Sequence, residues 1–246
     1  LKSLLTGPMA KIPIRWGLTG TVPKAKYEFT SLFVSLGPVI GKLSASELQE
    51  KGVLAQCHVN IVQLKDNVKF SNYQSELKYL TENGERLDAI SKLIGKIKDS
   101  GNTLILVDRI SAGKELQRRL SDIFSLLKDA PSVSFVSGDT KLDERRENYD
   151  EVATASNKII IATYGVAAVG INIPRIFNLV LLEPGKSFVR VIQSIGRGIR
   201  KAEDKDFVQI WDITSSCKFA KRHLTQRKAY YKEANYPFSM EKLDYK

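Results

Sequence analysis

The residues best suited to chemistry lie in one short stretch, residues 193–200 (QSIGRGIR). If this stretch is a helix, its period of about 100° per residue places Gln193, Arg197 and Arg200 on one side. The opposite side would be apolar and would dock on a core, formed by Phe188, Val191, Ile192, Ile195 and Ile199. Two forked, permanently charged donors held one turn apart suit a polyphosphate ligand. A solvated basic helix end, favoured by the helix dipole, is the alternative.

Further polar residues follow segments that are typical of buried strands. The apolar runs at 103–107, 158–163 and 178–182 and the run at 132–136 are each short enough to be strands of a parallel sheet. Sites in such sheets usually lie at the carboxyl ends of the strands. The residues expected at that edge are Asp108, Arg109, Ser137, Gly138, Thr163 and the loop around Gly170.

The elements that would position these residues form an α/β fold with a parallel sheet and flanking helices. Helical stripes alternate with the strands, which favours right-handed crossovers. Further strands are expected at 55–64 and 207–213, and a basic helix at about 217–234. A short strand at 12–18 is expected to run into the hydroxyl pair Thr19 and Thr21 around Gly20, a plausible hinge or phosphate contact.

The charge distribution favours a polyanionic partner. The net charge is +11, and residues 60–160 are balanced, so the excess lies at both ends of the chain. Nucleic acid is the first expectation, and a solubilising surface is the alternative. Two cysteines without a CxxC motif offer neither a disulfide framework nor a zinc site. No membrane span or signal peptide is visible, so a cytoplasmic protein is expected.

Three segments together resemble superfamily-2 helicases. The segment 161–163 (IAT) with 170–174 (GINIP) is similar to motif V of that family, and 193–200 fits the motif VI pattern QxxGRxxR. The segment 18–21 (LTGT) resembles motif III. Further phrases, such as 135–138 (FVSG), are similar to the phage UvsW-type branch-migration helicases. The resemblance implies a second RecA-like domain, preceded by the tail end of a first.

The resemblance also implies roles for individual residues. Arg197 and Arg200 match arginine fingers that reach the γ-phosphate of ATP, and Gln193 matches their polar companion. Gly170 and Asn172 would line the nucleotide side of the cleft, although the family usually has Asp where this chain has Asn172. ATP and Mg²⁺ would be bound mainly by the missing amino-terminal half.

Other positions match the nucleic-acid and coupling elements of the family. Thr163, Ser137, Gly138 and Arg109 would contact the nucleic-acid backbone. The stretch Thr19, Gly20 and Thr21 would couple hydrolysis to domain movement.

Three regions are expected from these assignments. Residues 1–68 would be the end of the first RecA-like domain and a linker, 69–214 the second RecA-like domain, and 215–246 a basic helix and tail. The helix is expected to bind DNA, with phosphate contacts and base stacking by Lys221, Arg222, Arg227, Lys228, Tyr230 and Tyr231. The alternative is that this helix packs against the sheet and that its tyrosines lie in the core.

The expected function is that of half of an ATP-dependent DNA helicase acting on forked, Holliday-type or R-loop substrates, with RNA–DNA hybrids included. Its partners would be DNA and the first RecA-like domain of the same protein. The 246 residues contain no G-x-x-x-x-G-K-[ST] loop and no acidic Mg²⁺ motif, so this chain alone is predicted inactive. The alternatives are a translocating motor subunit of a restriction or repair complex and a non-catalytic nucleic-acid-binding module.

Overall fold

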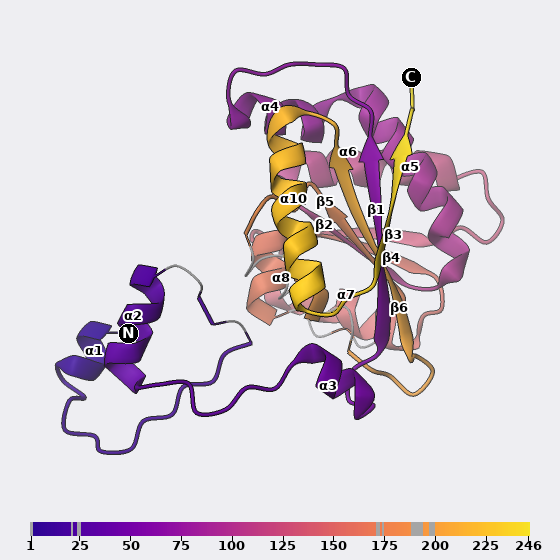
Figure 1. Cartoon of the computed structure of the whole chain (residues 1–246). Helices are drawn as coiled ribbons and strands as arrows, with labels where there is room; N and C mark the ends of the chain where they lie inside the picture. Colours follow the sequence, from indigo (N-terminus) through magenta and orange to yellow (C-terminus); the bar gives the residue numbers. More distant parts are fainter. Residues whose placement is uncertain are drawn as a thin grey trace. The chain divides into compact units, whose positions relative to one another are not determined.

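The chain forms two compact units, Leu1–Ser44 and Ala45–Lys246. The structure is a computed structural model that describes residues 2–20, 22–23, 26–170, 173, 175–187, 194–196 and 200–246. The larger unit carries the sheet (Figure 1).

The larger unit is built on a seven-stranded parallel sheet with the order β3-β4-β2-β5-β6-β1-β7. Its strands are β1 (Gln56–Leu64), β2 (Thr103–Val107), β3 (Ser132–Val136), β4 (Lys158–Thr163), β5 (Asn178–Leu182), β6 (Phe207–Ser215) and β7 (Phe238–Leu243). Every residue of β2 and β5 is buried. The apolar runs predicted as strands are therefore the central strands, which need apolar side chains on both faces.

Helices cover both faces of this sheet. The described helices of this unit include α3 (Ala45–Glu50), α4 (Tyr73–Glu82), α5 (Gly84–Ile97), the 3-10 turn η1 (Lys98–Ser100), α6 (Ile110–Phe124), α7 (Leu142–Thr154), α8 (Tyr164–Gly170) and α10 (Lys218–Glu233). One core holds side chains of α7, α8 and α10, and the other holds side chains of α5 and α6. The expected α/β architecture with a parallel sheet and flanking helices is confirmed.

The sheet extends beyond the boundaries expected from the sequence. β1 lies between β6 and β7, with Gln56 opposite Phe207 and Val59 opposite Phe238. A division at residue 68 would cut this strand out of its own sheet, and one at 214 would remove β7. The structure therefore separates the units after Ser44. The loop expected after Thr163 is also different, since residues 164–170 form α8.

The smaller unit contains α1 (Lys2–Thr6) and α2 (Lys26–Leu36), and turns at residues 7–11 follow α1. The strand expected at 12–18 does not form, because this segment has no paired neighbour among the described residues. Arg15 instead ties the unit together by donating hydrogen bonds to the carbonyls of Leu5 (3.0 Å) and Ser35 (3.3 Å). Thr19 and Gly20 are exposed, and Thr21 lies outside the described residues.

Candidate functional site

The carboxyl ends of three adjacent strands carry the residues predicted to contact nucleic acid. β3, β4 and β2 are neighbours, and Val107 at the end of β2 pairs with Thr163 at the end of β4. Ser137 and Gly138 follow β3 directly, and Arg109 follows β2 by two residues. The structure thus brings Thr163, Ser137, Gly138 and Arg109 to one edge of the sheet.

A tight turn shapes the edge after β3. The Ser137 amide donates to the Thr140 hydroxyl (2.9 Å), and the Asp139 amide donates to the Ser137 hydroxyl (3.3 Å). A Cβ added to Gly138 would meet no atom within 4 Å. The space beside the Gly138 Cα therefore allows close approach by a ligand, which a glycine favours.

Arg109 begins helix α6 as its N-cap residue, with an extended backbone. Its guanidinium donates to the Glu82 carboxylate at 3.2 Å, and the two side chains are 32% and 37% exposed. Half-exposed pairs of this kind contribute at most about 1 kcal/mol. A phosphate could therefore compete with Glu82 for Arg109. Thr163, the last residue of β4, is half-buried at the same edge of the sheet.

The nucleotide-side candidate Arg200 lies outside any helix. It forms an isolated antiparallel bridge with Leu54, so the expectation that it shares a helix face with Gln193 is wrong. The Arg200 carbonyl accepts a hydrogen bond from the Lys205 ammonium at 2.7 Å. Lys205 is 2% exposed, and burial lowers its pKa to about 7. A buried lysine thus fixes the backbone from which the Arg200 side chain extends.

Several predicted site residues lie outside the described residues. These are Gln193, Arg197 and Asn172. Gly170 is the last residue of α8. Ile195 is fully buried in the core that also holds α8 and α10, which confirms the prediction that an apolar side chain of this stretch docks inside.

A buried arginine holds the backbone just ahead of the 188–193 segment. Arg227 of α10 donates to both carboxylate oxygens of Asp212 at 2.8 Å, and to the Gly185 carbonyl at 2.7 Å. The Tyr231 hydroxyl donates to the same Asp212 carboxylate at 2.7 Å. Since Arg227 and Asp212 are 1% and 0% exposed, this clamp lies inside the protein.

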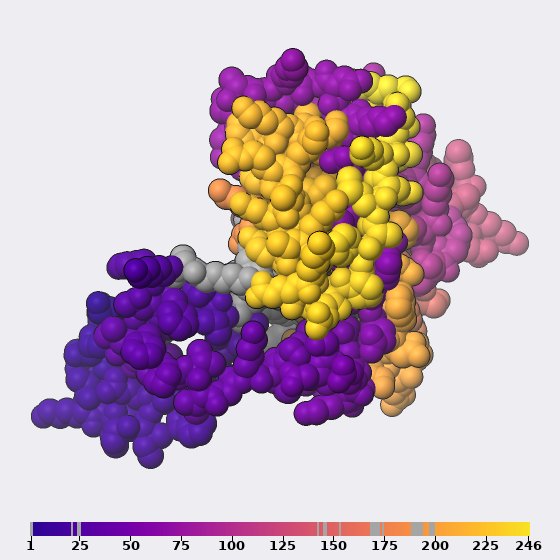
Figure 2. Space-filling view, viewed as in Figure 1, coloured from indigo at the N-terminus to yellow at the C-terminus, as the bar shows by residue number. Residues whose placement is uncertain are grey.

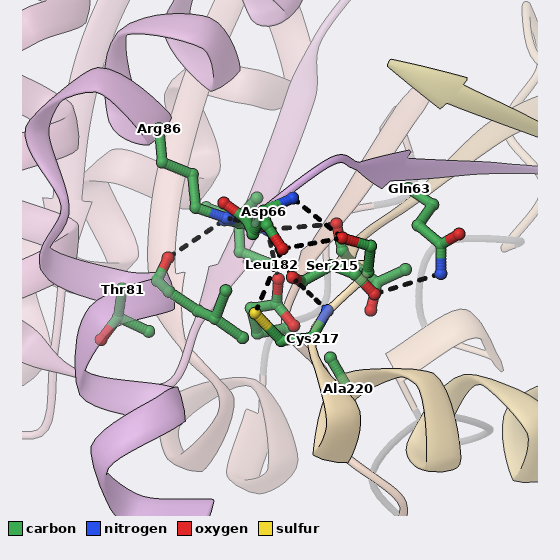
Figure 3. Close-up of polar contacts among 12 residues, drawn as sticks. Gln63, Asp66, Thr81, Arg86, Leu182, Ser215, Cys217 and Ala220 are labelled. Carbon is green, nitrogen blue, oxygen red and sulfur yellow. Dashed lines mark hydrogen bonds and ion pairs between the residues drawn. The ribbon is translucent and has the colours of Figure 1, made fainter. Parts of the chain in front are cut away.

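A second buried arginine, Arg86 of α5, organises the carboxyl ends of β1, β5 and β6 (Figure 3). It donates to Asp66 at 3.3 Å, to Glu183 at 2.5 Å and to the Thr214 carbonyl at 3.1 Å. The Ser215 hydroxyl also donates to Asp66 at 2.6 Å. These bonds connect three strand ends through one side chain.

The two arginines face three buried carboxyl groups, from Asp66, Asp212 and Glu183. If all three were ionised, the cluster would carry a net negative charge in a medium that solvates it poorly. Burial accordingly raises the pKa of Glu183 to about 7, partly offset by Arg86 and Arg227. Glu183 also has a positive φ of 44°, at the point where β5 passes into the segment leading to residue 193.

Sequence reasoning missed this cluster and misread part of α10. Arg227 and Tyr231, expected to contact DNA, are buried. Tyr230 is half-buried and donates to the Lys186 carbonyl at 3.1 Å. The sequence feature that indicates this burial is the spacing of Ala220, Leu224, Arg227 and Tyr231, which places Arg227 on the buried face of the helix.

The described residues hold no group of three His, Cys, Asp or Glu side chains that could bind a metal ion. Both cysteines are free and buried. None of the described helices has the length and apolar character needed to cross a membrane.

Comparisons with known proteins point to one family. Residues 85–202 match the family model for the helicase conserved C-terminal domain. The chain is 27% identical over 239 residues to the ATP-dependent DNA helicase UvsW of Enterobacteria phage T4, covering 94% of the chain and 46% of the relative. The structure of T4 UvsW superposes with a TM-score of 0.65 at 21% identity, over 78% of this chain and 42% of that one.

Two further structures share the fold. A Vibrio vulnificus protein assigned as an HsdR subunit of a type I restriction enzyme gives a TM-score of 0.71 at 20% identity, over 91% of this chain and 43% of that one. Domain 2 of the DEAD-box helicase Mss116p, bound to an RNA duplex, gives 0.52 at 15% identity, over 76% and 64%. The chain spans less than half the length of the curated relatives it matches.

Proposed function

We propose that this chain, whose residues 85–202 match the helicase conserved C-terminal domain and which has a RecA-like fold, is the C-terminal half of an ATP-dependent DNA helicase of superfamily 2. It would act on forked, Holliday-type or R-loop DNA. The observation that carries the proposal is the placement of Arg109, Ser137, Gly138 and Thr163 on three adjacent strand ends. These residues supply a guanidinium and two hydroxyls, which are groups that bind phosphodiesters.

The 193–200 segment would bind the nucleotide from the side of this chain's RecA-like domain. Arg197 and Arg200 would stabilise the charge that develops on the γ-phosphate, with Gln193 as their polar companion. Gly170 and Asn172 would line the same side. When bound, Mg²⁺ neutralises phosphate charge; its ligands would come from the other RecA-like domain. The buried Lys205 contact to Arg200 supports this role, because a finger needs a fixed base.

We assign the smaller unit, Leu1–Ser44, to the end of the first RecA-like domain, and the larger unit to the second. Three apolar side chains of the smaller unit support this assignment: Ile14, Trp16 and Leu18 are 73%, 75% and 97% exposed. A domain that lacks its other elements leaves such side chains uncovered. Thr19, Gly20 and Thr21 would then couple hydrolysis to movement between the two domains.

A translocating motor subunit of a restriction complex is the second candidate. The superposition with the Vibrio vulnificus structure over 91% of this chain favours it. A strand-displacement assay on a synthetic four-way junction separates the two. A helicase of the proposed class resolves the junction in an ATP-dependent manner, whereas a restriction motor translocates on duplex DNA without separating the arms.

The proposal is tested by ATPase measurements with forked DNA. The chain alone is expected to turn over ATP far below about 1 s⁻¹, the lower end of the usual range for such enzymes. The intact protein, with both RecA-like domains, is expected to reach that range and to need DNA for it. DNA-stimulated turnover by the chain alone would refute the proposal that it is half of the enzyme.

A further inference from the structure

Helix α10 presents a row of cations on the side opposite to its buried stripe. Lys218, Lys221, Arg222 and Lys232 are exposed, whereas Leu224 and Tyr231 point into the core. The exposed residues recur at helical spacing, so they form one continuous face. The space-filling view shows α10 and β7 forming an open surface that no other element of the larger unit covers (Figure 2).

These four cations are not neutralised within the described part of the chain. None of them makes an ion pair there, although the Lys218 ammonium lies 5.7 Å from the centroid of the Phe219 ring. Helix α6 differs, since Arg118 and Arg119 both pair with Glu115. A helix whose outer cations lack partners attracts a polyanion.

The length and position of the row match a nucleic-acid backbone. Lys218 and Lys232 are 14 residues apart, about 21 Å along a helix, which corresponds to about six base pairs of duplex. The helix begins just after β6 ends at Ser215, at the carboxyl edge of the sheet. The row therefore starts at the edge that carries Thr163 and Ser137 and leads away from it.

The surface offers charge but no stacking platform. Tyr231 is fully buried, and the Tyr230 hydroxyl is bound to the Lys186 carbonyl. The Phe219 ring lies edge-on to Tyr73, with centroids 6.3 Å apart. Binding of single strands usually relies on aromatic side chains that stack on bases. The absence of a free aromatic on the outer face of α10 favours double-stranded DNA.

We propose that the outer face of α10 binds the phosphate backbone of a duplex arm of the DNA substrate, through Lys218, Lys221, Arg222 and Lys232. This contact is independent of base sequence. The proposal rests on the proposed function, because it requires that the strand-end residues bind the same DNA molecule. The duplex arm would lie along α10, while the junction lies at the carboxyl edge of the sheet.

The test compares two variants of the 246-residue chain that lose the same charge. One carries K218Q, K221Q, R222Q and K232Q on α10. The control carries K92Q, K96Q, K114Q and K128Q, four exposed lysines on and just after α5 and α6, across the sheet from α10. Binding of a 20-base-pair duplex and of single-stranded (dT)20 is measured by fluorescence anisotropy between 50 and 200 mM salt. Thermal melting checks that both variants fold.

The α10 variant is expected to bind the duplex at least tenfold more weakly. Its slope of log K against log salt should become less negative by roughly 3–4, because each lost phosphate contact removes about 0.9 from the magnitude of the slope. Binding of (dT)20 should change less, and the control should bind like the parent.

Equal effects of the two variants, no effect of the α10 variant, or an equal loss on (dT)20 would overturn the proposal. A third variant, T163A with S137A, separates this outcome from failure of the proposed function. If it weakens binding to a fork while the α10 variant does not, the strand-end site stands and the α10 surface is rejected.

Discussion

Replacement of Arg227 by methionine probes the buried clamp that precedes the 188–193 segment. Arg227 makes two 2.8 Å bonds to Asp212 and one 2.7 Å bond to the Gly185 carbonyl. Arg227→Met keeps much of the side-chain volume and removes all three donors. It leaves the Asp212 carboxylate, which is fully buried, with Tyr231 as its remaining side-chain donor in the described structure.

The expected loss of stability is large, because the variant leaves a buried charge without its partner. Removal of one partner of a buried ion pair costs about 3–5 kcal/mol. For a unit of this size, 1 kcal/mol shifts Tm by about 2–4 °C, so Tm should fall by about 6–20 °C. Arg118→Met is the matched control, since Arg118 is 59% exposed in its pairs with Glu115 and Asp122. The free energy of unfolding of Arg118→Met should fall by no more than about 1 kcal/mol.

The assay is urea unfolding of the chain followed by far-UV circular dichroism, together with the double variant Asp212→Asn, Arg227→Met. The double variant should cost less than the sum of the two single variants by at least about 1 kcal/mol, because the second change removes the stranded charge. A loss for Arg227→Met no greater than that for Arg118→Met would refute the clamp. It would return Arg227 to the exposed DNA-contacting role expected from the sequence.

Three further outcomes are expected. Burial raises the pKa of Glu183 to about 7, so the folded protein holds a proton that the unfolded chain releases near pH 4.5. Stability should therefore fall by up to about 3 kcal/mol as pH rises through this window, and Glu183→Gln should remove that fall in urea titrations. Ile195→Ala should cost about 2–5 kcal/mol by thermal melting, since Ile195 is fully buried; a loss below 0.5 kcal/mol would contradict its docking. Lys205→Met should lower kcat of the intact enzyme several-fold with KM for ATP little changed, by releasing the Arg200 backbone; an unchanged kcat would reject that anchor.

The central strands could be predicted because their signal is local. Segments such as 103–107 (TLILV) and 178–182 (NLVLL) are apolar after their first residue, and strands buried on both faces have few other choices. The grouping of Arg109, Ser137 and Thr163 followed from one rule, that the ends of parallel strands meet at one edge.

The position of β1 and β7 could not be predicted in this way. Which strand pairs with β1 depends on long-range packing, and β7 (FSMEKL) has a mixed polar sequence because most of its side chains are exposed. Arg200 was assigned to a helix from its spacing alone, yet it pairs with Leu54, a distant partner that spacing does not reveal.

The inner face of α10 was misread for a related reason. A helix that is rich in lysine and arginine and also contains two tyrosines looks like a surface helix, unless the partner of each side chain is known. Asp212 is that partner for Arg227, and it lies in the middle of a buried strand. A carboxylate between the apolar residues of 210–213 (IWDI) was the clue that a cation would be buried opposite it.

Steady-state ATP hydrolysis by the intact enzyme with saturating DNA, measured for Arg197→Ala and Arg200→Ala, tests the central claim most directly. Both variants should lose at least about a hundredfold in kcat while nucleotide binding changes little, because a finger acts on charge that develops in the transition state. Lysine at either position should rescue poorly, since a point charge does not reproduce the planar fork. Near-normal kcat in either arginine variant, with normal melting, would contradict the claim for that residue and leave it as part of a basic surface.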